Sequence, residues 1–247
     1  MLKIGISGVC GRMGRSIAEL ALKQEGVTVS AVFERPDADQ IKKDLGLVLG
    51  GKEKGIIITS DIENVCKDID CLIEFTFPFP TMEHLAICAK NNIAMVIGTT
   101  ALTADDEEKI KQASARIPIV FSPNMSIGVN LLFDVVRQAV RVLGNDFDVK
   151  VDETHHVHKK DSPSGTAKMI AKVIKEFSGK EISIEAFREG EVIGNHGVIF
   201  ESPYESIEIR HDAKSRDVFA VGALKAARFL EGKEPGLYDM NDVLGLK

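Results

Sequence analysis

Residues 153–166 bring together several side chains that can move a proton near neutral pH. His155, His156 and His158 lie within one short stretch of this segment. An unperturbed imidazole exchanges its proton near pH ~6.5, so each histidine can act as an acid or a base. Lys159 adds a positive charge or a further proton donor. These residue types predict chemistry on an anion.

A helix start is expected directly after these side chains. Ser162 and Pro163 favour it, because serine is a common N-cap and proline fits the first helical position. The helix is predicted over residues 164–177. The amides of Gly165 and Thr166 would then point toward a carboxylate or a phosphate. Proton carriers beside an anion cradle indicate a catalytic pocket.

Two other interpretations of the histidines stay open. A zinc hydrolase would use them as ligands, with His196 or a nearby carboxylate completing the set. Against this, an extended strand would place His156 and His158 on one face and His155 on the other. The segment also holds no H-x-x-x-H pair and no cysteine. Alternatively, the histidines are surface residues that flank a basic turn.

The elements at the start of the chain predict a nucleotide-binding unit. Residues 2–7 and 27–33 are expected to be strands, and residues 12–24 a helix between them. The glycine loop at 8–14, GVCGRMG, lies where a dinucleotide-binding unit holds the pyrophosphate. Cys10 departs from the G-x-G-x-x-G spacing, so a plain strand-to-helix turn is the alternative.

Two charged residues follow the second expected strand. Glu34 stands where an acidic residue binds the ribose hydroxyls, and Arg35 where an arginine faces a 2′-phosphate. Both NADH and NADPH are therefore plausible cofactors. The alternative is that these are two solvated charges at a strand end. A protein that senses NAD(H) without turnover would also use this loop, but it would leave the histidine segment without a role.

Further buried strands and polar loops continue the α/β pattern. The expected strands are residues 56–59, 71–74, 94–97 and 119–121, with helices that begin near Thr81 and Thr103. Thr103 and Asp106 resemble a capping box. Polar loops at 75–78, 98–100 and 122–124 follow three of these strands. Such loops either line the ligand crevice of an open parallel sheet or are plain turns.

The pattern changes after Pro123, which indicates a second domain. A helix is expected at 131–142, a strand at 148–153, and a later strand at 206–210 that alternates isoleucine with charged residues. This alternation predicts antiparallel strands with one exposed face. A last helix at 219–230 would return to the first domain.

Composition excludes some classes of protein. The net charge of -6 and the pI of about 5.6 argue against a general nucleic-acid binder. No apolar run approaches the ~20 residues of a membrane span. The four cysteines are scattered without a C-x-x-C pair, which predicts free thiols and a cytoplasmic protein.

Several motifs in order resemble the dihydrodipicolinate reductase family. They are G-x-x-G-R-M-G at 8–14, F-T-x-P at 75–78, G-T-T at 98–100, H-H-x-H-K through P-S-G-T at 155–166, and G-L-Y-D-M at 236–240. The similarity therefore covers nearly the whole chain.

The resemblance implies an α/β protein that reduces 4-hydroxy-tetrahydrodipicolinate, a small cyclic dicarboxylate of lysine biosynthesis, with NADPH or NADH. It implies a Rossmann-like parallel-sheet nucleotide domain over residues 1–126 and 216–247. Residues 127–215 would form a smaller α+β domain that binds the substrate and assembles a homotetramer. No metal is implied, and neither nucleic acid nor membrane is an expected partner.

The resemblance also implies roles for individual residues. His155 and Lys159 would be catalytic, and protonated His155 suits a general acid, a role that typically contributes ~10² to 10⁴-fold. The substrate carboxylates would be held by His156, Gly165 and Thr166. The pyrophosphate would be surrounded by Gly8, Gly11, Arg12 and Met13, and the adenosine ribose by Glu34 and Arg35. The nicotinamide side would be lined by Gly98, Thr99, Thr100, Ser122, Pro123, Asn124 and Met125.

Overall fold

The structure, a computed structural model, describes residues 1–246 and shows two compact units. The first unit contains Met1–Met125 and Phe219–Gly245, and the second contains Ser126–Val218. Lys247, the last residue of the predicted nucleotide domain, lies outside the described residues.

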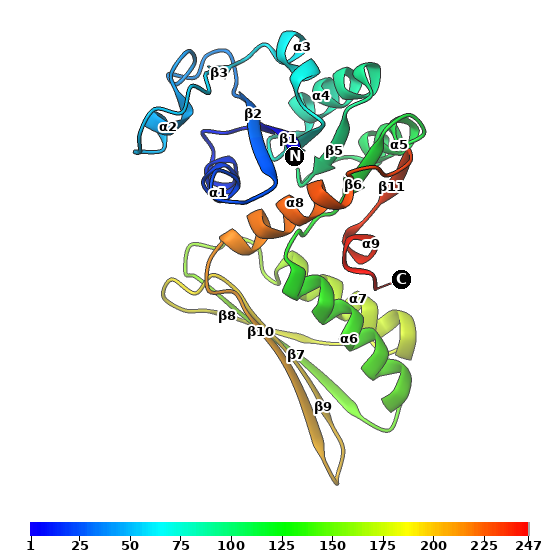
Figure 1. Cartoon of the computed structure of the whole chain (residues 1–247). Helices are drawn as coiled ribbons and strands as arrows, with labels where there is room; N and C mark the ends of the chain where they lie inside the picture. The colour runs from blue at the N-terminus through cyan, green and yellow to red at the C-terminus, as the bar shows by residue number, and fades with distance from the viewer. Residues whose placement is uncertain (247) are drawn as a thin grey trace. The chain divides into compact units, whose positions relative to one another are not determined.

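The first unit is built on a seven-stranded sheet in which every strand pair is parallel. Its strand order is β11-β6-β5-β4-β1-β2-β3 (Figure 1). The strands are β1 (Leu2–Ser7), β2 (Val27–Phe33), β3 (Ile58–Thr59), β4 (Cys71–Glu74), β5 (Ala94–Ile97), β6 (Pro118–Phe121) and β11 (Gly236–Tyr238). All residues of β4 and β5 are buried, as expected for strands covered on both faces. The Rossmann-like sheet is therefore confirmed.

Helices of the first unit follow local signals in the sequence. They are α1 (Arg12–Ala21), α2 (Leu45–Val48), α3 (Ile62–Val65), the 3-10 helix η1 (Cys66–Asp68), α4 (Pro78–Asn91), α5 (Ala104–Ala113), α8 (Asp217–Phe229) and α9 (Met240–Leu244). The capping box of Thr103 and Asp106 is confirmed at α5. Helix α1 ends before the predicted residue 24, because Lys23 and Gln24 donate to carbonyls only three residues back. Helix α4 begins earlier than predicted, with proline in its first turn.

The end of the chain returns to the first unit, as expected. Strand β11 pairs with β6, and helix α8 packs closely on the loop after β6. A Cβ atom on Gly222 of α8 would lie 1.7 Å from the carbonyl oxygen of Met125. Only glycine allows this approach of two backbones, which explains a glycine in the middle of a helix.

The second unit is a mixed four-stranded sheet with the order β10-β9-β7-β8. It contains α6 (Ile127–Leu143), β7 (Asp148–His155), α7 (Gly165–Ser178), β8 (Ile184–Arg188), β9 (Asn195–Glu201) and β10 (Ser206–Asp212). The expectation of antiparallel strands is correct for β9 and β10. It is wrong for β8, which runs parallel to β7, because α7 carries the chain back before β8 begins.

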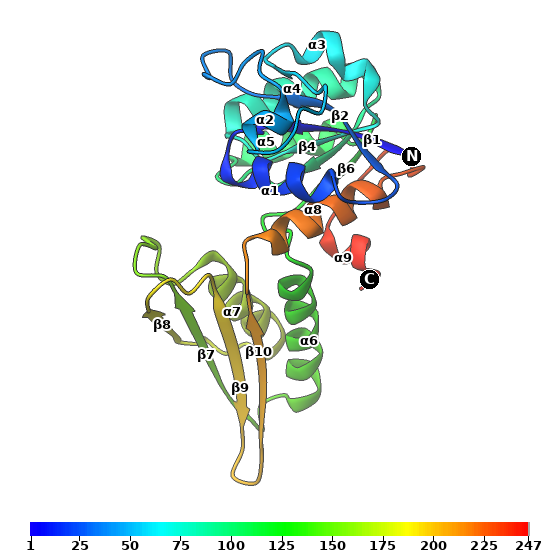
Figure 2. The same cartoon turned by 60° about the vertical axis from the view of Figure 1, so that its left-hand side comes forward.

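Helices α6 and α7 cover one face of this sheet (Figure 2). The core between them contains Leu132, Val136, Val140, Val151, Ile170, Val173, Ile174, Val198 and Phe200. Strand β7 continues to His155, two residues beyond the predicted end. Val151, Glu153 and His155, which are every second residue of the strand, all lie on its buried face. A carboxylate and an imidazole thus lie side by side at the end of an apolar core.

None of the helices within residues 1–246 is long and apolar enough to cross a membrane.

Candidate active site

The glycine loop between β1 and α1 closes tightly on itself. Gly8 has a φ of +70°, and a Cβ on Gly14 would lie 2.2 Å from the Gly8 carbonyl oxygen. Gly11 is the N-cap of α1, and no side chain among the described residues caps it. The first amides of the helix therefore face outward beside a bare backbone. This arrangement fits the phosphates of a dinucleotide cofactor.

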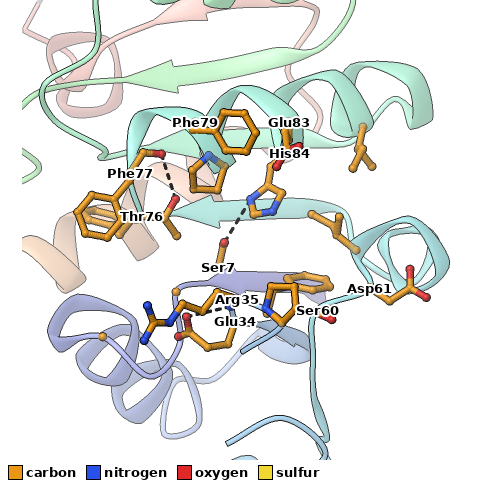
Figure 3. A pocket seen from close by; sticks show the side chains of 18 of the residues that line it. Ser7, Glu34, Arg35, Ser60, Asp61, Thr76, Phe77, Phe79, Glu83 and His84 are labelled. Carbon is orange, nitrogen blue, oxygen red and sulfur yellow. Dashed lines mark hydrogen bonds between the residues drawn. The ribbon is translucent and has the colours of Figure 1, made fainter. Parts of the chain in front are cut away.

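A cleft of about 650 Å³ opens beside this loop (Figure 3). It lies at the carboxyl ends of β1, β2 and β4, where the strand order reverses and parallel sheets bind ligands. Four predicted cofactor residues line it, namely Gly8, Gly11, Glu34 and Arg35. The cleft lining among the described residues does not include Arg12, Met13, Gly98, Thr99, Thr100, Ser122, Pro123, Asn124 or Met125.

Glu34 and Arg35 differ in how they are held. The Glu34 carboxylate accepts from the amides of Cys10 and Arg35, each at 3.0 Å. The Arg35 side chain is 73% exposed, and its Nε lies 3.4 Å from Asp37. Glu34 is thus fixed at the glycine loop, while Arg35 can reorient toward a ligand.

The polar loops after β5 and β6 are held by internal contacts. A Cβ on Gly98 would lie 2.2 Å from the ring of Phe75. The Thr99 hydroxyl lies 2.8 Å from the Thr81 hydroxyl. Ser122 donates its hydroxyl to the carbonyl of Asn124 at 2.8 Å. Both loops lie at strand ends of the crevice edge, outside the 650 Å³ cleft.

The sequence reasoning missed a buried pair on the wall of this cleft. Glu74, the last residue of β4, is fully buried, and its Oε2 lies 2.6 Å from Nδ1 of His84. The Thr76 hydroxyl donates to the other oxygen of Glu74. Ser7 Oγ lies 3.3 Å from the same His84 nitrogen, and His84 lines the cleft. The sequence signal for this pair was the glutamate at the end of the apolar run 71–74, because a buried carboxylate needs a polar partner.

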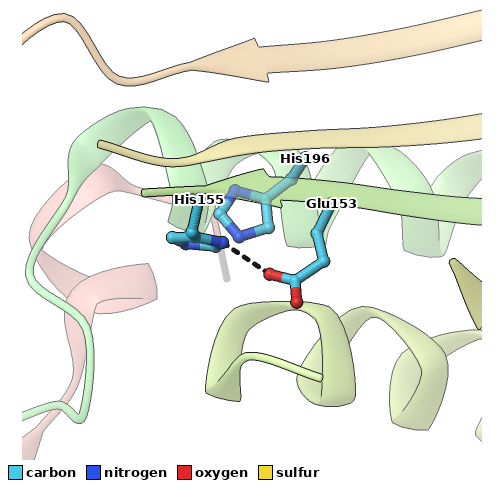
Figure 4. Close-up of side chains that lie close together, drawn as sticks. All are labelled: Glu153, His155 and His196. Atoms are coloured by element: carbon cyan, nitrogen blue, oxygen red, sulfur yellow. Dashed lines mark ion pairs between the residues drawn. The ribbon is translucent and has the colours of Figure 1, made fainter. Parts of the chain in front are cut away.

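The second unit contains a similar pair. The Glu153 carboxylate is fully buried, and its Oε2 forms an ion-pair contact of 2.6 Å with Nδ1 of His155 (Figure 4). The other oxygen, Oε1, accepts from the amide of Ser164 at 3.1 Å and from Arg188 at 3.2 Å. The ring of His196 lies edge-on to His155, with 5.1 Å between centroids.

Burial controls the ionisation of these groups. Burial lowers the pKa of His155, and the opposing charge of Glu153 only partly offsets it. Burial therefore disfavours the protonated form of His155 in the unliganded protein. Burial and the nearby His155 also lower the pKa of His196 to about 4. For Glu153, burial favours a higher pKa, but the hydrogen bonds from Ser164 outweigh it and the pKa is lowered.

Other residues of the histidine segment have contacts of their own outside this pair. His156 is past the strand end, with Nε2 3.4 Å from Arg216. His158 is exposed and faces Glu191 at 3.3 Å. The Lys159 ammonium contacts both carboxylate oxygens of Asp161, at 2.7 and 2.9 Å. Strand β7 ends at His155, so the strand geometry weighed against a zinc site does not extend to His156 and His158.

Helix α7 begins at Gly165, one residue after the predicted start at residue 164. Its N-cap is Ser164, whose hydroxyl accepts from the amide of Ala167 at 3.2 Å. Gly165 and Thr166 occupy the first turn, where helix amides point outward. Gly165 is exposed, and a Cβ there would meet nothing within 4 Å. The predicted anion site at Gly165 is thus accessible from solvent. It lies next to Ser164, whose amide donates to Glu153.

The alternative of a zinc site can be tested against distances. Glu153, His155 and His196 offer ligand atoms within 4.8 Å of one another. Two ligands of a tetrahedral zinc lie about 3.3 Å apart at the usual bond lengths. The 2.6 Å between His155 and Glu153 is shorter. These two atoms are therefore too close together to be two ligands of one tetrahedral zinc.

Comparisons with known proteins agree with the motifs. The family model for the N-terminus of dihydrodipicolinate reductase matches residues 2–125, and the model for its C-terminus matches residues 128–244. The 4-hydroxy-tetrahydrodipicolinate reductase of Anaeromyxobacter dehalogenans is 41% identical, with 100% of this chain and 99% of the relative covered. That of Nitrosomonas eutropha is 42% identical, with the same coverage.

A solved structure shares the fold. The dipicolinate-bound dihydrodipicolinate reductase from Paenisporosarcina sp. TG-14 superposes with a TM-score of 0.82 at 24% identity, with 98% of each chain covered. The amine dehydrogenase from Mycobacterium smegmatis gives 0.67 at 12% identity, with 98% of this chain and 95% of that chain covered. The two family models together cover nearly the whole sequence, and the chain therefore belongs to the dihydrodipicolinate reductase family.

Proposed function

We propose that this chain catalyses the NAD(P)H-dependent reduction of 4-hydroxy-tetrahydrodipicolinate to tetrahydrodipicolinate, in the diaminopimelate route of lysine biosynthesis. The observation that carries the proposal is the full-length similarity to reductases of that name, at 41% and 42% identity. The chain is thus an oxidoreductase. Its first unit binds the cofactor, and its second unit binds the substrate.

The first unit binds the nicotinamide cofactor, which supplies the hydride when it is bound. Gly8 and Gly11, with Arg12 and Met13 of the first helical turn, surround the pyrophosphate. The tight glycine loop and the uncapped start of α1 support this assignment. The loops at 98–100 and 122–125 lie toward the nicotinamide.

Glu34 and Arg35 let the first unit accept both NADH and NADPH. Glu34 already lies against the glycine loop, where its carboxylate can accept from ribose hydroxyls. Arg35 is exposed and held only by a 3.4 Å contact with Asp37. A 2′-phosphate would compete for that guanidinium, because paired charge-assisted hydrogen bonds to phosphate are strong.

The second unit binds the cyclic dicarboxylate at the start of α7. The amides of the first turn of α7, at Gly165 and Thr166, receive one carboxylate. His156 adds a donor, and Lys159 supplies a positive charge beside them. A dipicolinate-bound reductase of the same fold supports a planar cyclic dicarboxylate as the ligand class.

His155 provides the proton in the second unit. Its Nδ1 faces Glu153, so Nε2 is the nitrogen available to the substrate. A bound dianion favours the imidazolium, since an opposite charge within a few ångströms raises the pKa of a histidine. Substrate binding would therefore favour the charged form of the acid, which burial disfavours beforehand. Lys159 stabilises negative charge that develops on the ring.

The same second unit is proposed to assemble the chain into a homotetramer in the cytoplasm. Large apolar side chains stay exposed on its sheet, including Phe187 of β8 and Ile207 of β10, at 50% and 40% exposure. Exposed apolar surface of this kind favours burial against another protein surface. Light scattering of the purified chain would measure the assembly.

A direct assay tests the function. Purified protein is mixed with NADPH or NADH and freshly generated 4-hydroxy-tetrahydrodipicolinate, and the loss of reduced-nicotinamide absorbance is followed. We expect turnover that needs both the substrate and the protein. Absence of turnover with either cofactor, in protein that is folded by circular dichroism, would refute the proposal.

A further inference from the structure

We propose that Glu153 is a positioning residue that fixes the tautomer of His155 and holds its imidazolium form in place. The inference rests on the proposed reduction, because it assigns how the acid of that reaction is set up. Glu153 is fully buried, and we assign it a role that acts through its 2.6 Å contact with His155.

The two oxygens of Glu153 have different partners. Oε1 accepts from the Ser164 amide and from both terminal nitrogens of Arg188, at 3.1 to 3.2 Å. Each of these partners can only donate. Oε2 faces Nδ1 of His155 at 2.6 Å. Neither atom has another hydrogen-bond partner among the described residues, and a carboxylate has no proton to give, so the inference assigns the proton of this contact to Nδ1.

Fixing the proton on Nδ1 leaves Nε2 to exchange a proton with the substrate. Space beside Nε2 is kept open by Gly194, since a Cβ there would lie 3.0 Å from that nitrogen. Through the Ser164 amide, the same carboxylate also holds the N-cap of α7. One buried side chain thus fixes the orientation of the acid and its place beside the anion cradle.

Glu153 also supplies the negative charge that an imidazolium at this position needs. Burial disfavours the charged ring, and the positive charges of Lys159 and Arg188 add to that effect. The groups that face His155 from the surrounding elements are Glu153, Lys159, Asp161, Arg188 and His196. Asp161 is held by Lys159, which leaves Glu153 as the carboxylate in contact with the imidazole.

The variant Glu153→Gln tests this arrangement with little change in size. The amide oxygen must replace Oε1, because Arg188 and Ser164 both donate there. The amide NH2 group then faces Nδ1 of His155. Nδ1 has to accept, so the tautomer is reversed and the imidazolium loses its partner.

We expect Glu153→Gln to lower kcat about 10-fold, with the substrate KM changed less than about 3-fold. The high-pH limb of the kcat profile should move down by about one unit or more, since the acid becomes harder to protonate. A merely structural role would lower kcat without moving this limb. The matched control is Glu201→Gln, which breaks only an exposed pair with Lys150 and should leave both the limb and kcat unchanged.

A measurement on the unaltered protein keeps the proposal testable if the variant does not fold. Nitrogen-15 NMR of the histidine rings reports which nitrogen carries the proton, and the His155 signals are assigned by their loss in His155→Gln. We expect neutral His155 to carry its proton on Nδ1. A proton on Nε2 in the neutral ring, or an unmoved pH limb in a folded Glu153→Gln, would overturn the inference.

These outcomes separate the inference from the proposed function. If the unaltered protein does not oxidise NADPH or NADH with the substrate, the function fails. If it does, and the variant keeps the unaltered pH profile, only the role of Glu153 fails. Metal analysis of the same preparation gives a further check, because a tightly held zinc required for turnover would replace the proton between Glu153 and His155 and overturn the inference.

Discussion

Each unit contains one fully buried glutamate whose Oε2 lies 2.6 Å from Nδ1 of a histidine, namely Glu74 with His84 and Glu153 with His155. The surroundings of the two pairs differ. The second oxygen of Glu74 accepts from the neutral hydroxyl of Thr76. The second oxygen of Glu153 is in contact with the charged Arg188. The glutamate–histidine pair therefore has a neutral partner in the first unit and a charged partner in the second.

The difference indicates two uses of one arrangement. His84 comes from α4 and lines the cleft beside the glycine loop, so we expect it to orient a bound cofactor. His155 lies on the same strand as its glutamate, which also accepts from the amide at the start of α7. Under the proposed function, the charged setting holds a group that gains and loses a proton, and the neutral setting holds a group that needs only a fixed orientation.

The largest expected effect separates the two histidines. His155→Gln should lower kcat about 10²-fold with a modest change in substrate KM, because the lost acid acts in the transition state. Steady-state kinetics with saturating cofactor measures this. An unchanged kcat would remove His155 from its role and make the two pairs equivalent.

The second effect concerns His196. Its ring lies beside His155 of the second pair. Its pKa of about 4 lies below the value of 6.5 expected in the unfolded chain. Below pH 6.5 the unfolded state therefore binds the proton first, and stability is lost as the pH falls toward 4.

Lowering the pH from about 7 to 5 should therefore reduce the free energy of unfolding by about 2 kcal/mol through this group. Denaturant unfolding of the unaltered protein and of His196→Gln at both pH values measures the difference. The same acid sensitivity in both proteins would show that His196 is not its source.

A third effect tests the cofactor side. Arg35→Ala should weaken NADPH binding about 10-fold and NADH binding less than about 2-fold, since only NADPH has a 2′-phosphate. Asp37→Asn is the matched variant, because it removes the partner of Arg35 and should favour NADPH slightly. Fluorescence titration with both cofactors gives the dissociation constants. An equal loss of affinity for NADPH and NADH would show that Arg35 has a structural role and does not contact the 2′-phosphate.

The smallest effect is expected at His84. His84→Gln keeps a side chain that can donate to Glu74, so we expect a cofactor KM raised about 3-fold and a kcat changed by less than about 2-fold. A loss of kcat as large as that of His155→Gln would contradict the division of roles between the pairs.

Much of the fold was predictable because it depends on local patterns. Apolar runs gave the bounds of β4 and β5 directly, and the capping box at Thr103 marked the start of α5. The direction of β8 was not predictable in the same way. It depends on the crossover through α7 and on pairing with a strand about thirty residues earlier in the chain.

The site was predictable where residue types alone indicate chemistry, as for the family motif around His155. The partners of that histidine were harder to find. Glu153 and Arg188 are 35 residues apart in the sequence. No local sequence pattern predicts a contact over that separation. The sequence did contain a signal, because Val151, Glu153 and His155 are spaced two residues apart and therefore lie on one face of β7. A glutamate at an inward position of a strand predicts a buried partner.

The most direct test of the account is the pH dependence of kcat/KM in the unaltered protein, which reports ionisation in the free enzyme. Protonated His155 is the required form, and burial lowers its pKa from 6.5. The account predicts that kcat/KM declines as the pH rises through that lowered value, on the acid side of 6.5, and that His155→Gln lacks this decline. A kcat/KM that rises with pH there, or a decline that persists in His155→Gln, would contradict it.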